Sequence, residues 1–532
     1  MSPTISAEWV NVGGTQYNAG TAAGDAAGTW SWDGADDMKL NGYNGGAIEA
    51  AGKLNVSYEG NNTVTNDNGH GIKAKDGANE NAELNIQGDA SSTLNVTSSR
   101  DAITSVGNIN IDGAGTVNAT STEHDAIDAG GDVTIKGSGN VNATGDSDGV
   151  RADGNITIDN SGTVTAKATD DQGIDANENL IIKGGGKVEA SSIKDNAIWA
   201  DGNIEISGGS QVKASSEEDA AIDGKNSLTV TNASLNASGV GYGIYVYKGI
   251  TLDGATVTVR TSASGGQAIA LITDGDDIVI KNGSIVDAFA EGKFSVAIST
   301  RNHQPNVAGG HIYISDSVVK AIARYVETGG DGPDHYSNDQ SGEVIPEPRG
   351  LNIGIFAQTY EGITPASISI VRSKLTAEGD TAAIFALAIS EDGKAIGTIE
   401  IEGAPIQTPA GGKIINYRYE EEYGPSISYE AGQTIGTGDA VIDSPYDAAV
   451  AKSTAIVPPE EIKPEEKPGE TKPGSKSEVT KTTKTVAVAA TGAKIAGKLA
   501  ATGDASSTAI VAAALAGTAA IAAGAVVSRK RS

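Results

Sequence analysis

The chain contains no cysteine among its 532 residues, which excludes disulfide bridges and thiolate metal sites. Its five histidines are scattered without the spacing of metal ligands, which argues against a zinc cluster. Basic residues are also in deficit, with 38 lysines and arginines against 68 aspartates and glutamates. Because nucleic-acid phosphates require a basic surface, this balance argues against nucleic acid as a partner. An acidic chain instead fits a solvated surface or a site for hard cations.

Aromatic residues make up only 4% of the chain, whereas glycine contributes 70 residues. A core built from Ile, Val and Ala suits thin, regular layers better than a bulky globular interior. A repeat of about 24 residues indicates such layers. It is marked by an Ala or Gly followed by a β-branched anchor residue. From Ile103 to Ile222, successive anchors are 23 or 24 residues apart. The anchors are Ile48, Ile72, Ile103, Ile127, Val150, Ile174, Ile198, Ile222, Ile244, Ile269 and Ile298.

Each repeat unit contains three apolar pairs that alternate with polar residues, separated by columns of Gly and Asn. Alternation with a period of two predicts half-buried strands, and Gly and Asn readily adopt turn conformations. Three strands and three turns per unit predict an all-β fold, the right-handed parallel β-helix of pectate lyases. Coils then stack ~4.8 Å apart. Anchors pack on anchors, and turn Asn side chains form a hydrogen-bonded ladder.

The periodicity weakens after residue 300, and the composition changes again near residue 458. We predict a lead-in over 1–27, a β-helix over 28–405 and a cap over 406–457. Residues 458–498 are rich in Pro, Lys and Glu and then in Thr and Ala, which predicts a disordered, wall-spanning linker.

The C-terminal residues 499–532 combine three local signals. The sequence LAATGD precedes residues 509–527, which carry no charge and are long enough to span a bilayer as a helix. Ten of these residues are Ala, so the drive for insertion is weak. The following Arg529, Lys530 and Arg531 would hold the tail on the cytoplasmic side.

This arrangement resembles the cell-wall sorting signal of Gram-positive surface proteins. The resemblance implies that a sortase recognises Leu499, cleaves between Thr502 and Gly503, and joins Thr502 to peptidoglycan. Ala500 replaces the usual Pro, which resembles the variant of high-GC Gram-positive bacteria. The protein is then extracellular and anchored in the wall, after a membrane-bound stage. An ordinary single-pass anchor is the alternative, and it also places the body outside the membrane.

The N-terminal sequence MSPTISAEWVNVGG lacks the basic start and apolar run of an export signal. Because a wall-anchored protein must be exported, we expect a truncated start or a fragment.

A second resemblance covers about residues 28–405. It is carried by Trp30-Ser31-Trp32-Asp33, by LNGYNGGAI (40–48) and by GNNTVT (60–65). The chain resembles bacterial carbohydrate-binding β-helix domains related to a cellulose- and pectin-binding clostridial surface protein. The resemblance implies a pectate-lyase-like fold, no established catalysis, calcium bound at acidic turns, and polysaccharide binding at the cell surface.

On each anchor strand, the residues one and three positions after the anchor are predicted to point outward. Sugars bind such faces by stacking on aromatic rings and by hydrogen bonds to carboxylates and amides. We predict a glycan-binding strip centred on the three aromatic members; the alternative is a solvated sheet face. The strip comprises Asp128, Arg151, Asp175, Trp199, Asp201, Tyr245 and Tyr247.

A column of acidic residues lies in the turn before the anchor strand. Carboxylates stacked at the coil spacing repel by about 1 kcal/mol per neighbour in water. Calcium, which takes 6–8 oxygen ligands with loose geometry, would relieve this repulsion. We therefore predict calcium ligands in this column; fully hydrated turns are the alternative. The column begins at Asp101, and the predicted ligands are Asp125, Asp148, Asp171, Asp195 and Asp219.

These inferences predict a monomeric, non-catalytic surface protein that binds plant cell-wall or host polysaccharide. One alternative is an adhesin for a host protein, or a surface stalk. A second is an enzyme acting on a pectin-like substrate, because Arg151 lies near Asp128, Asp153 and Asp175. A hydrolase needs paired carboxylates, and a lyase needs calcium-held carboxylates with a base. The Arg-Ile-Lys and paired-Asp signatures of polygalacturonases are absent.

Overall fold

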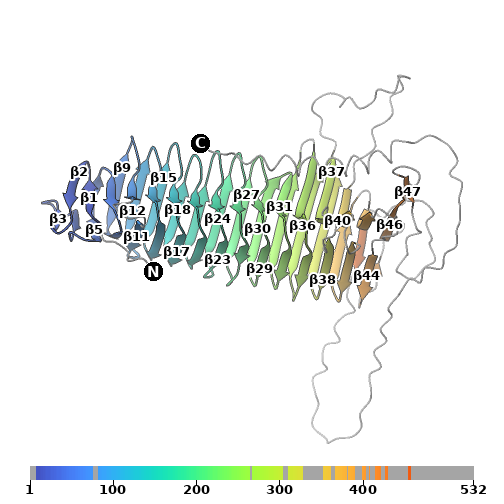
Figure 1. Ribbon diagram of the computed structural model, residues 1–532. Coiled ribbons are helices and arrows are strands. Elements are labelled where there is room, and N and C mark those ends of the chain that lie inside the picture. Colours follow the sequence, from blue (N-terminus) through green and yellow to red (C-terminus); the bar gives the residue numbers. More distant parts are fainter. Residues whose placement is uncertain are drawn as a thin grey trace, which may run out of the picture. The chain divides into compact units, whose positions relative to one another are not determined.

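A computed structural model describes an all-β protein, without a helix in the parts of the chain that it covers (Figure 1). The described residues are 7–75, 82–263, 266–302, 310–326, 352–360, 366–379, 382–389, 398–402, 406–407, 414–420, 426–428 and 453–456. The chain divides into units 1–458 and 459–532, and the second lies wholly outside this set. The predicted linker, the sorting signal and the membrane helix over 509–527 therefore lie outside the described residues.

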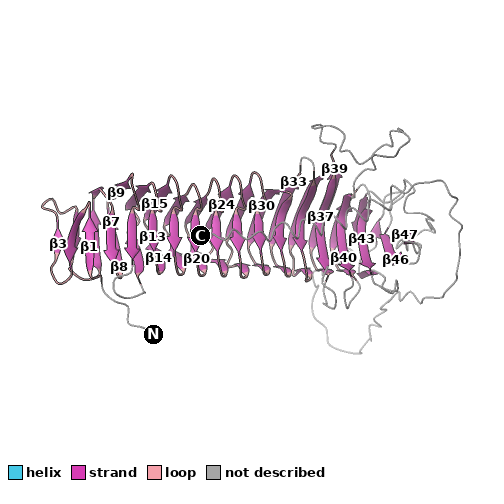
Figure 2. Ribbon diagram, turned by 45° about the horizontal axis from the view of Figure 1, so that its top comes forward, coloured by secondary structure: helices cyan, strands magenta, loops and turns pink. Residues whose placement is uncertain are grey.

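Each coil contributes one strand to each of three parallel sheets (Figures 1 and 2). The predicted parallel solenoid is confirmed. The anchor sheet contains β7 (Ile48–Ala51), β10 (Ile72–Lys75), β13 (Ile103–Ser105), β16 (Ile127–Ala129), β19 (Val150–Ala152), β22 (Ile174–Ala176), β25 (Ile198–Ala200), β28 (Ile222–Gly224), β31 (Tyr242–Val246), β34 (Gln267–Thr273), β37 (Phe294–Asn302), β40 (Asn352–Tyr360), β43 (Ala382–Ile389) and β46 (Ile414–Glu420).

The strand that follows in each coil belongs to the second sheet. This sheet contains β5 (Asp37–Asn41), β8 (Leu54–Glu59), β11 (Glu83–Gly88), β14 (Asn108–Gly113), β17 (Val133–Gly137), β20 (Ile156–Asn160), β23 (Leu180–Lys183), β26 (Ile204–Ile206), β29 (Leu228–Thr231), β32 (Ile250–Asp253), β35 (Ile278–Lys281), β38 (His311–Ser315), β41 (Ser367–Val371) and β44 (Thr398–Glu402).

The third sheet completes the coil. It contains β6 (Asn44–Gly45), β9 (Asn61–Asn66), β12 (Thr93–Ser98), β15 (Thr116–Ser121), β18 (Asn140–Thr144), β21 (Thr163–Lys167), β24 (Lys187–Ser192), β27 (Gln211–Ser216), β30 (Ser234–Val240), β33 (Thr256–Ser262), β36 (Ile285–Gly292), β39 (Val318–Tyr325) and β42 (Lys374–Glu378).

Antiparallel strands cover both ends of the parallel stack. At the start, β1 (Trp9–Val12) pairs with β2 (Thr15–Asn18) and with β7, and β4 (Trp30–Trp32) pairs with β3 (Ala23–Gly24) and with β5. At the other end, β47 (Ser426–Ser428) pairs with β46, and β48 (Ser453–Ile456) pairs with β42 and with β45 (Ile406–Gln407). Short antiparallel strands protect sheet edges from pairing with other chains.

The anchors pair directly with one another from Ile48 to Ile244, and all of them are buried. The predicted anchor Ile269 is wrong: Ile244 pairs with Leu271, which pairs with Ile298. The strands lengthen at β31, so Ile269 lies beside Tyr242, ahead of the part that enters the core. The dipeptide Ala268-Ile269 mimics the anchor pattern, but Ala270-Leu271 occupies the position.

The small residue before each anchor is explained by close packing at the corner that leads into the anchor sheet. A Cβ atom on Gly149 would lie 2.6 Å from the carbonyl oxygen of Gly173. A Cβ atom on Gly173 would lie 2.7 Å from the carbonyl oxygen of Ala197. Ala126, Ala197 and Ala221 are completely buried at the same position. The repeated Ala/Gly-Ile pair therefore reflects the core and this corner.

The predicted Asn ladder is confirmed in the turn between the anchor and second sheets. The Nδ2 atom of Asn179 donates to Oδ1 of Asn155 at 2.9 Å, and the Ser227 hydroxyl donates to Oδ1 of Asn203 at 2.8 Å. Two further amide ladders, which the sequence analysis did not predict, lie on the outer faces of the other sheets. They join Asn55, Asn85 and Asn110, and Asn61, Asn95, Asn118 and Asn142.

Candidate functional site: the outer face of the anchor sheet

The outer face of the anchor sheet brings the predicted glycan-binding residues into two rows. One row lies one position after the anchors, where the strand register aligns Asp128, Arg151, Asp175, Trp199 and Tyr245, with Asp223 between the last two. Asp201 and Tyr247 belong to the row three positions after the anchors. The alternation of each short strand positions these side chains, because its neighbours on either side of them enter the core.

Arg151 lies at the centre of a carboxylate cluster. Its Nη1 donates to Oδ1 of Asp128 at 2.7 Å, its Nη2 contacts Asp153, and its Nε lies 3.8 Å from Oδ2 of Asp175. Although burial disfavours the charge, the surrounding carboxylates raise the pKa of Arg151. Burial raises the pKa of Asp128 to about 6 and that of Asp175 to about 7, against the opposing charge of Arg151.

The indole of Trp199 is held in place by its neighbours. Its Nε1–H donates to Oδ1 of Asp201 at 3.0 Å. The ammonium group of Lys225 lies 2.6 Å from the same oxygen and 5.0 Å from the centre of a Trp199 ring. Trp199 itself is half-buried. An exposed ring that is already ordered loses little conformational freedom when it stacks on a ligand.

Tyr245 is buried, with 6% of its surface exposed, although the sequence analysis placed it on an open strip. Its hydroxyl donates to Oδ2 of Asp274 at 3.0 Å, and its ring lies 5.1 Å from Tyr242 and 5.2 Å from Tyr247. The lengthened strands bring further apolar side chains onto this face, which form one cluster with Tyr245. They are Ile269, Ile272, Val296 and Ile353. Tyr242 and Tyr247 remain half-buried at its side.

The predicted acidic column is divided in two by an offset of one residue. The backbone N–H groups that precede the anchors donate to the carbonyls of Asp101, Asp125, Asp148 and then Gln172. Asp171, Asp195 and Asp219 lie one position earlier in their turns. There Asp195 and Asp219 accept hydrogen bonds from the next backbone N–H, and Ser147 donates to Asp171. The structure therefore does not stack the predicted calcium ligands in one ladder.

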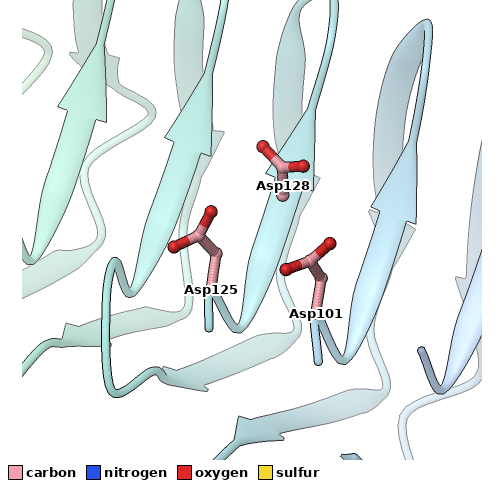
Figure 3. Close-up of side chains that lie close together, drawn as sticks. All are labelled: Asp101, Asp125 and Asp128. Carbon is pink, nitrogen blue, oxygen red and sulfur yellow. The ribbon is translucent and has the colours of Figure 1, made fainter. Parts of the chain in front are cut away.

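The upper part of the column meets the strip instead, as Figure 3 shows for Asp101, Asp125 and Asp128. These carboxylates come from two successive turns and from β16, and each offers an oxygen within 4.8 Å of the others. Oδ1 of Asp125 accepts the backbone N–H of Asp148 at 2.9 Å, and Nδ1 of His70 lies 3.1 Å from Oδ2 of Asp101. Asp101 was in the predicted column, but its meeting with Asp128 was not predicted.

The electrostatics of this acidic cluster, defined as Asp101, Asp125 and Asp128, favour partial neutralisation. Burial and then the charge of Asp101 raise the pKa of Asp125. Burial also acts to raise the pKa of Asp101, but His70 brings it below its usual value through a hydrogen bond and its charge. The neighbouring Asp148 is buried, and burial together with Asp125 raises its pKa well above the usual range. Three carboxylates and a low local dielectric can hold a hard cation.

No helix within the described residues is both long enough and apolar enough to cross a membrane. Comparisons with known proteins add no relatives: no family model, no curated protein and no solved structure matches the chain significantly.

Proposed function

We propose that this protein is a non-catalytic polysaccharide-binding protein of the bacterial surface, and that glycans bind on the outer face of the anchor sheet. The observation that carries the proposal is the ordered Trp199, whose ring is fixed by Asp201 and Lys225 in the middle of an aligned polar face. Carboxylates and an arginine lie on one side of it, and half-buried tyrosines lie on the other. This combination supports stacking and hydrogen bonding to successive sugar units.

Replacing Trp199 and Tyr247 by Ala is expected to weaken binding to an immobilised polysaccharide about tenfold or more, because two stacking surfaces are lost. The measurement is binding to a glycan array, followed by affinity electrophoresis in the best polysaccharide. Tyr313→Ala provides a matched control, because Tyr313 is 40% exposed on the second sheet, away from this face. Unchanged binding of the double variant would exclude the anchor-sheet face as the site.

The cellular setting remains part of the proposal. The C-terminal motif with Leu499, Thr502 and Gly503 supports sortase attachment to peptidoglycan, after a stage in the membrane. The protein would then act as a monomer outside the cell, without nucleic acid as a partner. The expected right-handed winding of the coils belongs to the same proposal. Mass spectrometry of wall digests, searching for Thr502 linked to a peptidoglycan peptide, tests the attachment.

Calcium is proposed to assist, with Asp101, Asp125 and Asp128 as its ligands. The donor set fits, because these are three carboxylates with oxygens within 4.8 Å, and calcium binds oxygen ligands. Arg151, which contacts Asp128, neutralises part of the same charge. The ion would compensate the negative charge that remains when Asp125 and Asp128 ionise.

Adding calcium at pH 8 is expected to raise the melting temperature by several degrees, because the ion binds only the folded arrangement of the three carboxylates. The gain should be smaller at pH 5, where protons compete for Asp125 and Asp128. Differential scanning calorimetry with EDTA and with calcium measures both effects. Asp125→Asn should abolish the gain, whereas Asp89→Asn, at an exposed site, should retain it. Melting that is indifferent to EDTA in the parent protein would exclude the ion.

Two alternatives lead to different results. If no glycan binds, the adhesin or stalk alternative is favoured, with a host protein as the ligand. A pectin lyase would release unsaturated uronates, which absorb in the ultraviolet. The contacts of Arg151 argue against it as the base, since three carboxylates hold its guanidinium protonated.

A further inference from the structure

Two buried polar side chains in adjacent strands of the anchor sheet each have a hydrogen-bond donor without a partner. They are Arg301 in β37 and Gln358 in β40, which lie directly opposite each other in the strand register. Arg301 is 3% exposed and Gln358 is 4% exposed. Within the described part of the chain, neither Nη1 of Arg301 nor Nε2 of Gln358 has a hydrogen-bond acceptor. An unsatisfied buried donor costs about 1–3 kcal/mol, so two neighbouring ones require an explanation.

The charge of Arg301 is already matched within the sheet. Its Nε donates to Oδ1 of Asp274 at 2.8 Å, and the other oxygen of Asp274 accepts the hydroxyl of Tyr245. The guanidinium also lies 5.9 Å from the centre of the Tyr245 ring. The two unpaired atoms therefore ask for a neutral acceptor. A second carboxylate would place two negative charges around one arginine in a buried site, and the chain already carries a net charge of −30.

Apolar groups surround these donors. In the row one position after the anchors, the small Ser299 stands between Ile272 and Phe356. The ring of Phe356 stacks on that of Phe385 at 5.2 Å, with an interplanar angle of 11°. Phe356 and Phe385 are half-buried, as are Tyr242 and Tyr247 near Tyr245. The same location therefore combines two donors, apolar side chains suited to a methyl group and partly exposed rings suited to a sugar.

We propose that Arg301 and Gln358 bind the carbonyl oxygen of an N-acetyl group, and hence that the preferred ligand is an N-acetylated sugar rather than a uronate. A carbonyl oxygen has two lone pairs and can accept from both donors, which lie in strands ~4.8 Å apart. The acetyl methyl packs against Ile272 and Phe356, while the pyranose ring reaches the half-buried tyrosines. The inference rests on the proposed polysaccharide binding and identifies the class of sugar.

The test measures calorimetric binding of the full chain to three oligosaccharides of equal length, built from N-acetylglucosamine, glucose and galacturonate. The N-acetylated oligomer is expected to bind most tightly. The variant Gln358→Leu, which keeps the volume but removes the donor, should weaken its binding about fivefold, the loss expected for one neutral hydrogen bond. Binding of the glucose oligomer should not change. The control Gln211→Leu alters an exposed glutamine on the third sheet and should change neither.

Melting without sugar separates a ligand site from a structural role. Because Gln358→Leu removes an unsatisfied buried donor, its melting temperature should equal or exceed that of the parent protein. A clearly lower value would mean that Gln358 supports the fold, possibly excluding a ligand role is not needed because the inference would then be overturned. Equal binding of glucose and N-acetylglucosamine oligomers, or tighter binding of the galacturonate oligomer, would also overturn the inference and leave polysaccharide binding intact. If the parent protein binds none of these oligomers and no glycan on the array, the proposed function itself fails.

Discussion

Raising the pH from 5 to 8 in the presence of EDTA is expected to lower the stability of the β-helix by about 2 kcal/mol or more. Three carboxyls on the outer face of the anchor sheet have raised pKa values. Burial is the first cause for each, and it raises the pKa of Asp128 to about 6, of Asp175 to about 7 and of Asp223 to about 8. The folded state therefore binds more protons than the unfolded chain between about pH 4 and pH 8. Stability present at pH 5 is lost as these groups ionise.

Asp223 is the sharpest probe of this effect, because one of its oxygens is buried without a hydrogen-bond donor. Asp223→Asn removes the charge that forms at high pH. We expect this variant to gain about 2 kcal/mol at pH 8 and almost nothing at pH 5. Thermal unfolding followed by circular dichroism at several pH values measures both. Asp89→Asn, at an exposed position, should leave the pH profile unchanged. An equal gain at both pH values would show that charge is not the cause.

Truncating the core anchor Ile174 to Ala is expected to destabilise the protein by about 2–5 kcal/mol. Ile174 is completely buried and pairs with Val150 on one side and Ile198 on the other. A cavity at this position therefore removes packing from two neighbouring coils. In solenoids each coil contacts mainly its neighbours, so the loss is concentrated in the middle of the stack.

The adjacent residue in the same strand supplies the contrast. Asp175→Asn, on the outer face, is expected to stabilise the protein at pH 8, because it removes a buried charge. Lys167→Ala, at an exposed position in the same coil, should change stability by no more than about 0.5 kcal/mol. Chemical denaturation of the three variants in one buffer gives the comparison. A small loss for Ile174→Ala, similar to that of Lys167→Ala, would contradict the assignment of the anchors to the core.

These expected results bear on function because stability and ligand binding share one face. Asp128 belongs both to the arginine cluster and to the acidic cluster, so a proton, Arg151 and a cation compete for it. A surface that retains buried carboxylates at a cost in stability is typical of a binding site. The pH experiments and the calcium experiment therefore report on the same groups from two directions.

The strip and the acidic column show how far sequence alone can locate a site. The row with Asp128, Arg151, Asp175 and Trp199 was predictable, because strand alternation determines which residues face outward. The burial of Tyr245 was not, since it depends on Ile269 and Ile353, which join this face from longer strands. Arg301 and Gln358 were also missed, because they lie 57 positions apart in the sequence and meet only through the strand register.

The amino-acid sequence by itself determined the coil period, the inward anchors and the Asn ladder, because side-chain alternation and turn preferences repeat locally. Only the tertiary structure decided which turn residues share a column. The step from Ile127 to Val150 is 23 residues and the step to Ile174 is 24, so Gln172 rather than Asp171 follows Asp148. A turn can absorb one residue without disturbing the strands on either side. The hydrogen bond from the Gly149 N–H to the Gln172 carbonyl selects the register, and with it the acidic residues that can meet a cation.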